Sequence, residues 1–117
     1  MRYLLVLLTM VLVGCAQLAT PDSLLESEWA EFGKQRGEKG YLRHSQPKLE
    51  ELDQQGILTD TLYAAYDTGY KEGQSEYCSQ SAFTLGLSGK PYLGICNKID
   101  TQFDYNYNAG MRAGSFK

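Results

Sequence analysis

Three cysteines carry the clearest chemistry in this sequence of 117 residues: Cys15, Cys78 and Cys96. Cys15 follows a basic residue at the start of the chain, an apolar stretch over residues 3–13 and the small residue Gly14. A positive start, an apolar stretch too short to span a bilayer and a small residue before a cut are the parts of a secretory signal. The sequence therefore predicts export, with a thiol placed at the cleavage point.

The run Leu12-Val13-Gly14-Cys15 resembles the lipobox of bacterial lipoproteins. The resemblance implies that the sulfur of Cys15 is diacylated, that the chain is cut before Cys15, and that the new amino group is then acylated. Several acyl chains on one residue anchor stably, at about 0.8 kcal/mol per buried methylene. Ala16 stands where enteric-type lipoproteins retained in the inner membrane carry Asp, which implies the outer membrane and a domain facing the periplasm. The alternative is a plain signal anchor with an incidental cysteine.

The cut would divide the chain into a removed signal peptide (1–14), a lipidated tether (15–22) and a single domain (23–117). A domain of that length has one modest hydrophobic core. Loss of Arg2 takes the formal charge from −3 to −4, and a mildly acidic domain with no basic block is a poor partner for nucleic acid. The expected partners are the membrane, through the lipid anchor, and an envelope protein or the cell wall.

Cys78 and Cys96 remain as an even pair in a compartment that forms disulfides. Closing a loop of this length contributes roughly 3 kcal/mol in chain-entropy models. The alternative is a redox-active or metal-binding pair. However, reactive dithiols usually lie as Cys-x-x-Cys, and structural zinc needs four Cys or His ligands, whereas the chain has one histidine, His44. We expect a structural disulfide, no metal and no cofactor.

Four segments of the exported chain have helical signals: 23–40, 47–56, 59–78 and 101–114. Ser23 and Glu26 match a capping box at the start of the first segment. The Gly- and Pro-rich stretch 79–97 is expected to be a loop with one helical turn at 81–85. The predicted fold is mainly α, a small domain of three to four helices with one disulfide-closed loop.

Six glycines recur at four-residue spacing behind an aromatic residue: Gly33 and Gly37 behind Trp29, Gly69 and Gly73 behind Tyr66, and Gly110 and Gly114 behind Tyr107. A glycine inside a helix costs about 1 kcal/mol relative to alanine, so something must offset that cost. Close helix crossing is the favoured explanation, and a glycine-lined ligand cleft is the alternative. The nine tyrosines likewise suit either a thin aromatic core or an aromatic binding surface.

Catalytic motifs are incomplete. Residues 84–91 approach a phosphate-binding loop, but Thr84 replaces its first glycine and Pro91 replaces its final Ser or Thr. His44 is the only candidate general base and lies in a polar segment, where a solvated loop residue is the simpler interpretation. The carboxylates of residues 50–53 are typical of a solvated helix face. We therefore expect no enzymatic activity.

A second resemblance covers most of the exported chain. It rests on Trp29 to Gly40, on Tyr66-Asp67-Thr68-Gly69-Tyr70-Lys71-Glu72-Gly73, and on Tyr77-Cys78 followed by Leu85-Gly86-x-Ser88-Gly89-Lys90-Pro91-Tyr92-x-Gly94-x-Cys96. These residues are similar to a family of small Gram-negative lipoproteins defined by a domain of unknown function. The sequence departs from the family pattern at Gln74, where an apolar residue is expected, and at Asn97, where proline is common. The resemblance implies location and architecture, and it assigns no catalytic residue.

The leading hypothesis is a membrane-tethered envelope lipoprotein that acts as a non-enzymatic interaction or structural module. The second is a periplasmic protein that binds a small molecule or glycan in a cleft lined by glycine and tyrosine, and the third is an envelope hydrolase. A filled glycine seam favours the first hypothesis. A concave pocket with converging tyrosine hydroxyls favours the second, and buried carboxylates at a cleft favour the third.

Overall fold

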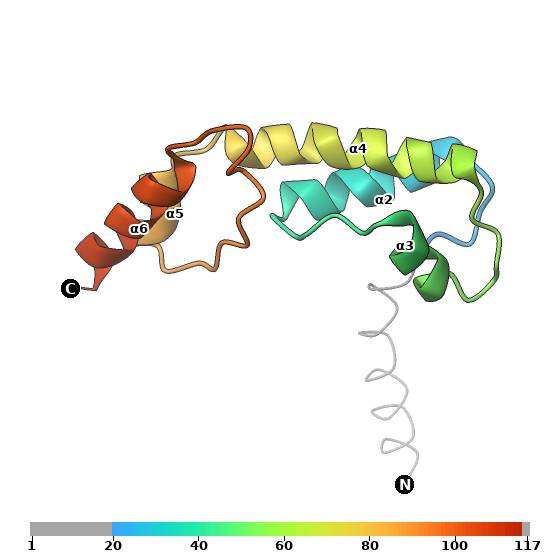
Figure 1. The fold of residues 1–117 in the computed structure, drawn as a ribbon, viewed down its shortest axis with the longest axis horizontal. Coiled ribbons are helices and arrows are strands. Elements are labelled where there is room, and N and C mark those ends of the chain that lie inside the picture. The colour runs from blue at the N-terminus through green and yellow to red at the C-terminus, as the bar shows by residue number, and fades with distance from the viewer. Residues whose placement is uncertain (1–19, 116–117) are drawn as a thin grey trace, which may run out of the picture.

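The computed structural model describes residues 20–115, and this part of the chain is all-helical. Its five helices are α2 Glu26–Glu38, α3 Gln46–Leu52, α4 Asp60–Cys78, α5 Ala82–Leu87 and α6 Phe103–Gly114. In Figure 1, α4 forms the long axis, α2 lies beside it, α3 lies below α2 in the view, and α5 and α6 lie beyond the far end of α4. The mainly α fold is confirmed. Cys15, the predicted signal peptide and the first part of the predicted tether lie outside the described residues.

Side-chain caps set the start of three helices. The hydroxyls of Ser45, Thr59 and Ser81 each accept the backbone N–H three residues later, at 3.3, 3.1 and 3.1 Å. Such a bond satisfies one of the backbone donors that a helix leaves free at its first turn. The cap at Ser81 explains α5, which is a longer helix than the single turn expected in this Gly- and Pro-rich stretch.

The start of α2 differs from the capping box expected at Ser23 and Glu26. The hydroxyl of Ser23 accepts the N–H of Leu25 at 3.0 Å, and Leu25 is an N-cap with no side-chain cap bond. The indole of Trp29 donates to the Ser23 carbonyl at 2.8 Å. This bond ties Ser23, which lies in a bend outside the helix, to the first turn of α2, and the helix begins at Glu26.

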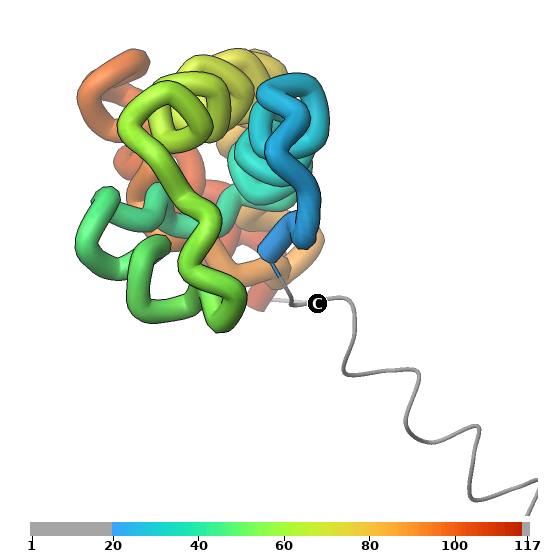
Figure 2. The backbone as a smooth tube through the Cα atoms, turned by 90° about the vertical axis from the view of Figure 1, so that its right-hand side faces the viewer, coloured from blue at the N-terminus to red at the C-terminus, as the bar shows by residue number. Residues whose placement is uncertain are grey.

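α2 and α4 run parallel. A Cβ added at Gly33 would meet the carbonyl of Tyr66, and one added a turn later at Gly37 would meet the carbonyl of Tyr70, so both helices advance in the same direction. Figure 1 shows both starting at the same end of the molecule. A parallel pair needs a crossover, which residues 39–59 and α3 supply. Figure 2 looks along the two helices, with the crossover beneath them.

The end of α2 is fixed by a glycine. Gly40 has a φ of +77°, the left-handed region that side chains rarely adopt, and it turns the chain into the crossover. A Cβ at Gly40 would also stand within 3.0 Å of the Tyr77 ring. The crossover therefore leaves α2 pressed against the last turns of α4.

α5 and α6 form a second parallel pair. A Cβ at Gly86 would meet the Tyr107 carbonyl, and one at Gly114, further along α6, would meet the carbonyl of Leu87 at the end of α5. Residues 88–102 form the crossover of this pair. We call α2, α4 and residues 39–59 the first unit, and α5, α6 and residues 88–102 the second unit.

Each unit has its own hydrophobic cluster. The first contains Trp29, Leu49, Leu62 and Tyr66. The second contains Ala82, Leu85, Ile95, Cys96, Phe103 and Tyr107. In each cluster, side chains from both helices are covered by a residue near or within the crossover, such as Leu49 or Ile95. The crossovers are therefore part of the core.

Candidate functional site

The predicted glycines of the first unit lie where α2 and α4 touch. A Cβ on Gly69 would stand closer than 3.0 Å to three backbone atoms of Ala30, and one on Gly73 would be equally close to Lys34. Gly33 and Gly37 face the backbone of α4 in the same way. We call this contact the glycine seam. It joins backbone to backbone and leaves no room for a ligand between the glycines.

The second unit has the same kind of seam. A Cβ on Gly110 would be closer than 3.0 Å to the carbonyl of Phe83, and one on Gly86 equally close to that of Tyr107. Gly114 is looser, with the Leu87 carbonyl 2.9 Å from its Cβ position. Gly86 was not among the predicted crossing residues, because its segment was expected to be a loop. Ser81, the cap three residues after the end of α4, is the signal that could have revealed it.

The contacts of the two seams correspond residue by residue. Gly33 in α2 and Gly86 in α5 both face a tyrosine carbonyl, that of Tyr66 or Tyr107. When the helices are matched by these contacts, further buried residues coincide: Gly69 with Gly110, Leu62 with Phe103, and Trp29 with Ala82. The described chain is therefore one helix-pair unit used twice, with different crossovers.

Tyrosine hydroxyls of α4 hold the first crossover. We call residues 41–44 the strap. Tyr63 donates to the His44 carbonyl at 2.9 Å, Tyr66 accepts the His44 N–H at 3.0 Å, and Tyr70 donates to the Tyr41 carbonyl at 2.7 Å. Burial raises the pKa of Tyr66 and of Tyr70, so both hydroxyls keep their protons at neutral pH. These hydroxyls bind backbone and do not converge on an open pocket.

Tyr70→Phe is expected to destabilise the fold by about 1 kcal/mol. The change removes one neutral hydrogen bond and leaves the Tyr41 carbonyl without this donor, while the ring remains in place. Urea unfolding measures the effect. Tyr105→Phe is the control, because Tyr105 is 66% exposed, and its unfolding curve should match that of the wild type. Equal curves for both variants would show that the strap is not held through its Tyr70 bond.

An ion pair fixes the strap to α4. Arg43 Nη1 lies 2.6 Å from Asp67 Oδ1, and Lys71 Nζ lies 3.0 Å from Asp67 Oδ2. Burial acts to raise the pKa of Asp67, but hydrogen bonds from Lys71 and Arg43 hold that pKa below its ordinary value. Asp67 is therefore an ionised structural anchor, poorly suited to transferring protons near neutral pH.

His44 is the last residue of the strap and is affected by two nearby positive charges. Burial, and then the charges of Arg36 and Lys48, lower the pKa of its imidazole. The unfolded chain takes up a proton near pH 6.5, whereas folded His44 takes it up only at lower pH. Between these values the unfolded state binds more protons, so His44 contributes stability above pH 6.5 that is lost as the pH falls.

His44→Gln is therefore expected to weaken the pH dependence of stability. The urea midpoint of the wild type should fall more than that of the variant between about pH 7 and about pH 5. Both curves must be recorded at the same ionic strength, because screening also changes the Arg43 ion pair. Parallel pH profiles would contradict the assignment of the shift to His44.

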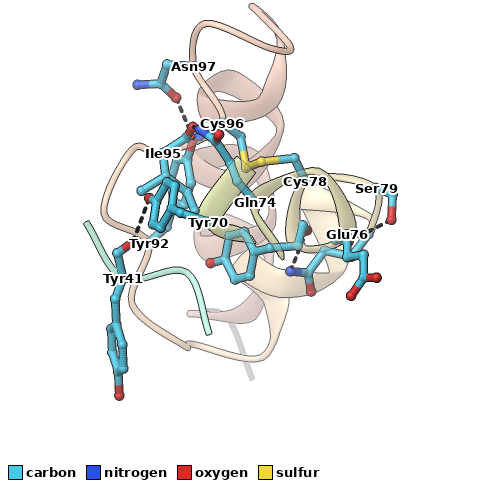
Figure 3. The surroundings of a disulfide bond; sticks show 12 residues. Tyr41, Tyr70, Gln74, Glu76, Cys78, Ser79, Tyr92, Ile95, Cys96 and Asn97 are labelled. Carbon is cyan, nitrogen blue, oxygen red and sulfur yellow. Dashed lines mark hydrogen bonds between the residues drawn. A yellow bond between two sulfur atoms is a disulfide. The ribbon is translucent and has the colours of Figure 1, made fainter. Parts of the chain in front are cut away.

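The predicted disulfide is confirmed. Cys78, the last residue of α4, is bonded to Cys96 in the second crossover, with the two Cα atoms 5.5 Å apart. Figure 3 shows Gln74 beside the bond, where its amide donates to the Ile95 carbonyl at 2.7 Å. Asn97 accepts the hydroxyl of Tyr92 at 2.6 Å. The bond therefore joins the two units, and the hydrogen bonds of Gln74 and Asn97 lie at the same junction.

Asp53 and the carboxylates around Lys34 make contacts within the domain. Asp53 is buried, and its carboxylate accepts the N–H of Leu58 at 2.7 Å, which closes the turn after α3. Lys34 lies 3.5 Å from Glu72 and 3.9 Å from Glu76 on the surface, and these charges raise the pKa of Lys34. Over residues 20–115, no group of three or more His, Cys, Asp or Glu side chains could hold a metal ion.

One hollow lies along the first turns of α2 and α4. We call it the groove, and its lining residues are Glu26, Ser27, Ala30, Asp60, Thr61, Ala64, Ala65 and Thr68. The lining is made of small side chains with a carboxylate at the start of each helix. Neither a glycine nor a tyrosine contributes to it. No sequence pattern predicts this groove, because the alanines that form it have no distinctive spacing.

The fold and its contacts define a small disulfide-bonded helical domain made of two glycine-seamed helix pairs. Within residues 20–115, none of the helices has the length and apolar character needed to cross a membrane. The chain belongs to the family DUF2799, described as a protein of unknown function, whose model matches residues 28–112. The match runs from α2 to α6 and confirms the resemblance to a family defined by a domain of unknown function. No curated protein and no solved structure matches the chain.

Proposed function

We propose that this protein is a lipoprotein of the bacterial outer membrane, anchored through Cys15 and facing the periplasm. The apolar start and the run Leu12-Val13-Gly14-Cys15 support the anchor. The Cys78–Cys96 disulfide supports an oxidising compartment, because such bonds rarely persist in the cytosol.

In this proposal the domain is a non-enzymatic interaction module for an envelope protein or the cell wall. One observation carries this proposal. The glycines and tyrosine hydroxyls that could have bound a ligand make contacts within the domain instead. The seam glycines contact backbone, and the hydroxyls of Tyr63, Tyr66 and Tyr70 bind the strap. What remains available for recognition is the outer surface, where large apolar side chains such as Leu24 and Tyr105 are exposed.

Cys15→Ser is expected to abolish incorporation of labelled palmitate and to leave the precursor uncut. Ala16→Asp is the matched control, because it keeps the acylated cysteine. That variant should retain the label but move to the inner-membrane fraction. Palmitate incorporated into the Cys15→Ser variant would overturn the lipoprotein assignment.

The interaction itself is tested by crosslinking in intact envelopes, followed by purification of the tagged protein. We expect discrete crosslinked species that the Cys15→Ser variant lacks, because the tether sets the local concentration of partners. Recovery of the protein without any crosslinked species would contradict the interaction module. Hydrolysis of purified envelope glycans or peptides by the protein would contradict the non-enzymatic assignment.

A further inference from the structure

We draw no further inference here: the strongest candidate, the groove of small side chains along the first turns of α2 and α4, carries none because nothing in the structure shows what covers it.

Discussion

Gly69→Ala is expected to lower the free energy of unfolding by at least about 2 kcal/mol. The added Cβ would lie within 3.0 Å of three backbone atoms of Ala30, and backbone cannot rotate aside as a side chain can. Overpacking of this kind costs up to about 3 kcal/mol or more, whereas the gain in helix propensity is about 1 kcal/mol. For a domain of this size the melting midpoint should fall by roughly 8–16 °C.

Two other variants separate the seam from general effects of alanine in α4 and α6. Ser75→Ala is an exposed change on α4, and its midpoint should equal or slightly exceed that of the wild type. Gly114→Ala should have a smaller effect than Gly69→Ala, because the nearest carbonyl is 2.9 Å from its Cβ position. A Gly69→Ala midpoint at or above that of the wild type would show that α2 and α4 can move apart without cost.

Loss of the disulfide should have an effect of similar or greater size. The double variant Cys78→Ser with Cys96→Ser is expected to lose about 2–5 kcal/mol of stability in guanidinium unfolding. Changing both residues avoids a free thiol that could form bonds between chains. The loss should be largest in the second unit, because Cys96 is fully buried in its core.

Native-state hydrogen exchange shows which helices lose stability when the disulfide is removed. Amides of α5 and α6 should lose more protection in the double variant than amides of α2 and α4, which keep their own core. The unchanged protein, compared before and after reduction, is the matched control and should show the same redistribution. Two free thiols in the purified wild-type protein would remove the basis of this prediction.

Local sequence signals were enough for most helices but not for their arrangement. The sequence predicts helices that start at residues 47 and 59, and α3 and α4 begin at Gln46 and Asp60. The four-residue spacing of Gly69 and Gly73 indicated a close crossing. It could not give the direction of the partner helix, because glycines at this spacing admit parallel and antiparallel neighbours alike. The direction depends on the crossover, which is a long-range feature.

The sequence also could not predict the strap or the match between the two units, because both depend on contacts between distant segments of the chain. The stripe of tyrosines on α4 was visible, but their hydroxyls bind backbone groups such as those of His44, and no side-chain pattern marks a backbone partner. The repeat is weak in sequence because only the tyrosine and two glycines are shared by α4 and α6. Trp29 and Ala82 occupy matching buried positions, and the difference in their volumes is taken up by the separate cores.

The parallel direction of the helix pairs also fixes the order in which the chain can fold. A hairpin of adjacent helices can close as soon as its second arm appears, but α2 must wait with its glycine face open until the crossover and α4 have followed. Cys78 then precedes Cys96 by a sequence separation of 18. If the chain is exported with its N-terminal end first, as proposed, Cys78 reaches the oxidising compartment before its partner. A competing thiol or oxidant that acts in this interval would trap a chain whose first unit is formed and whose second unit is not.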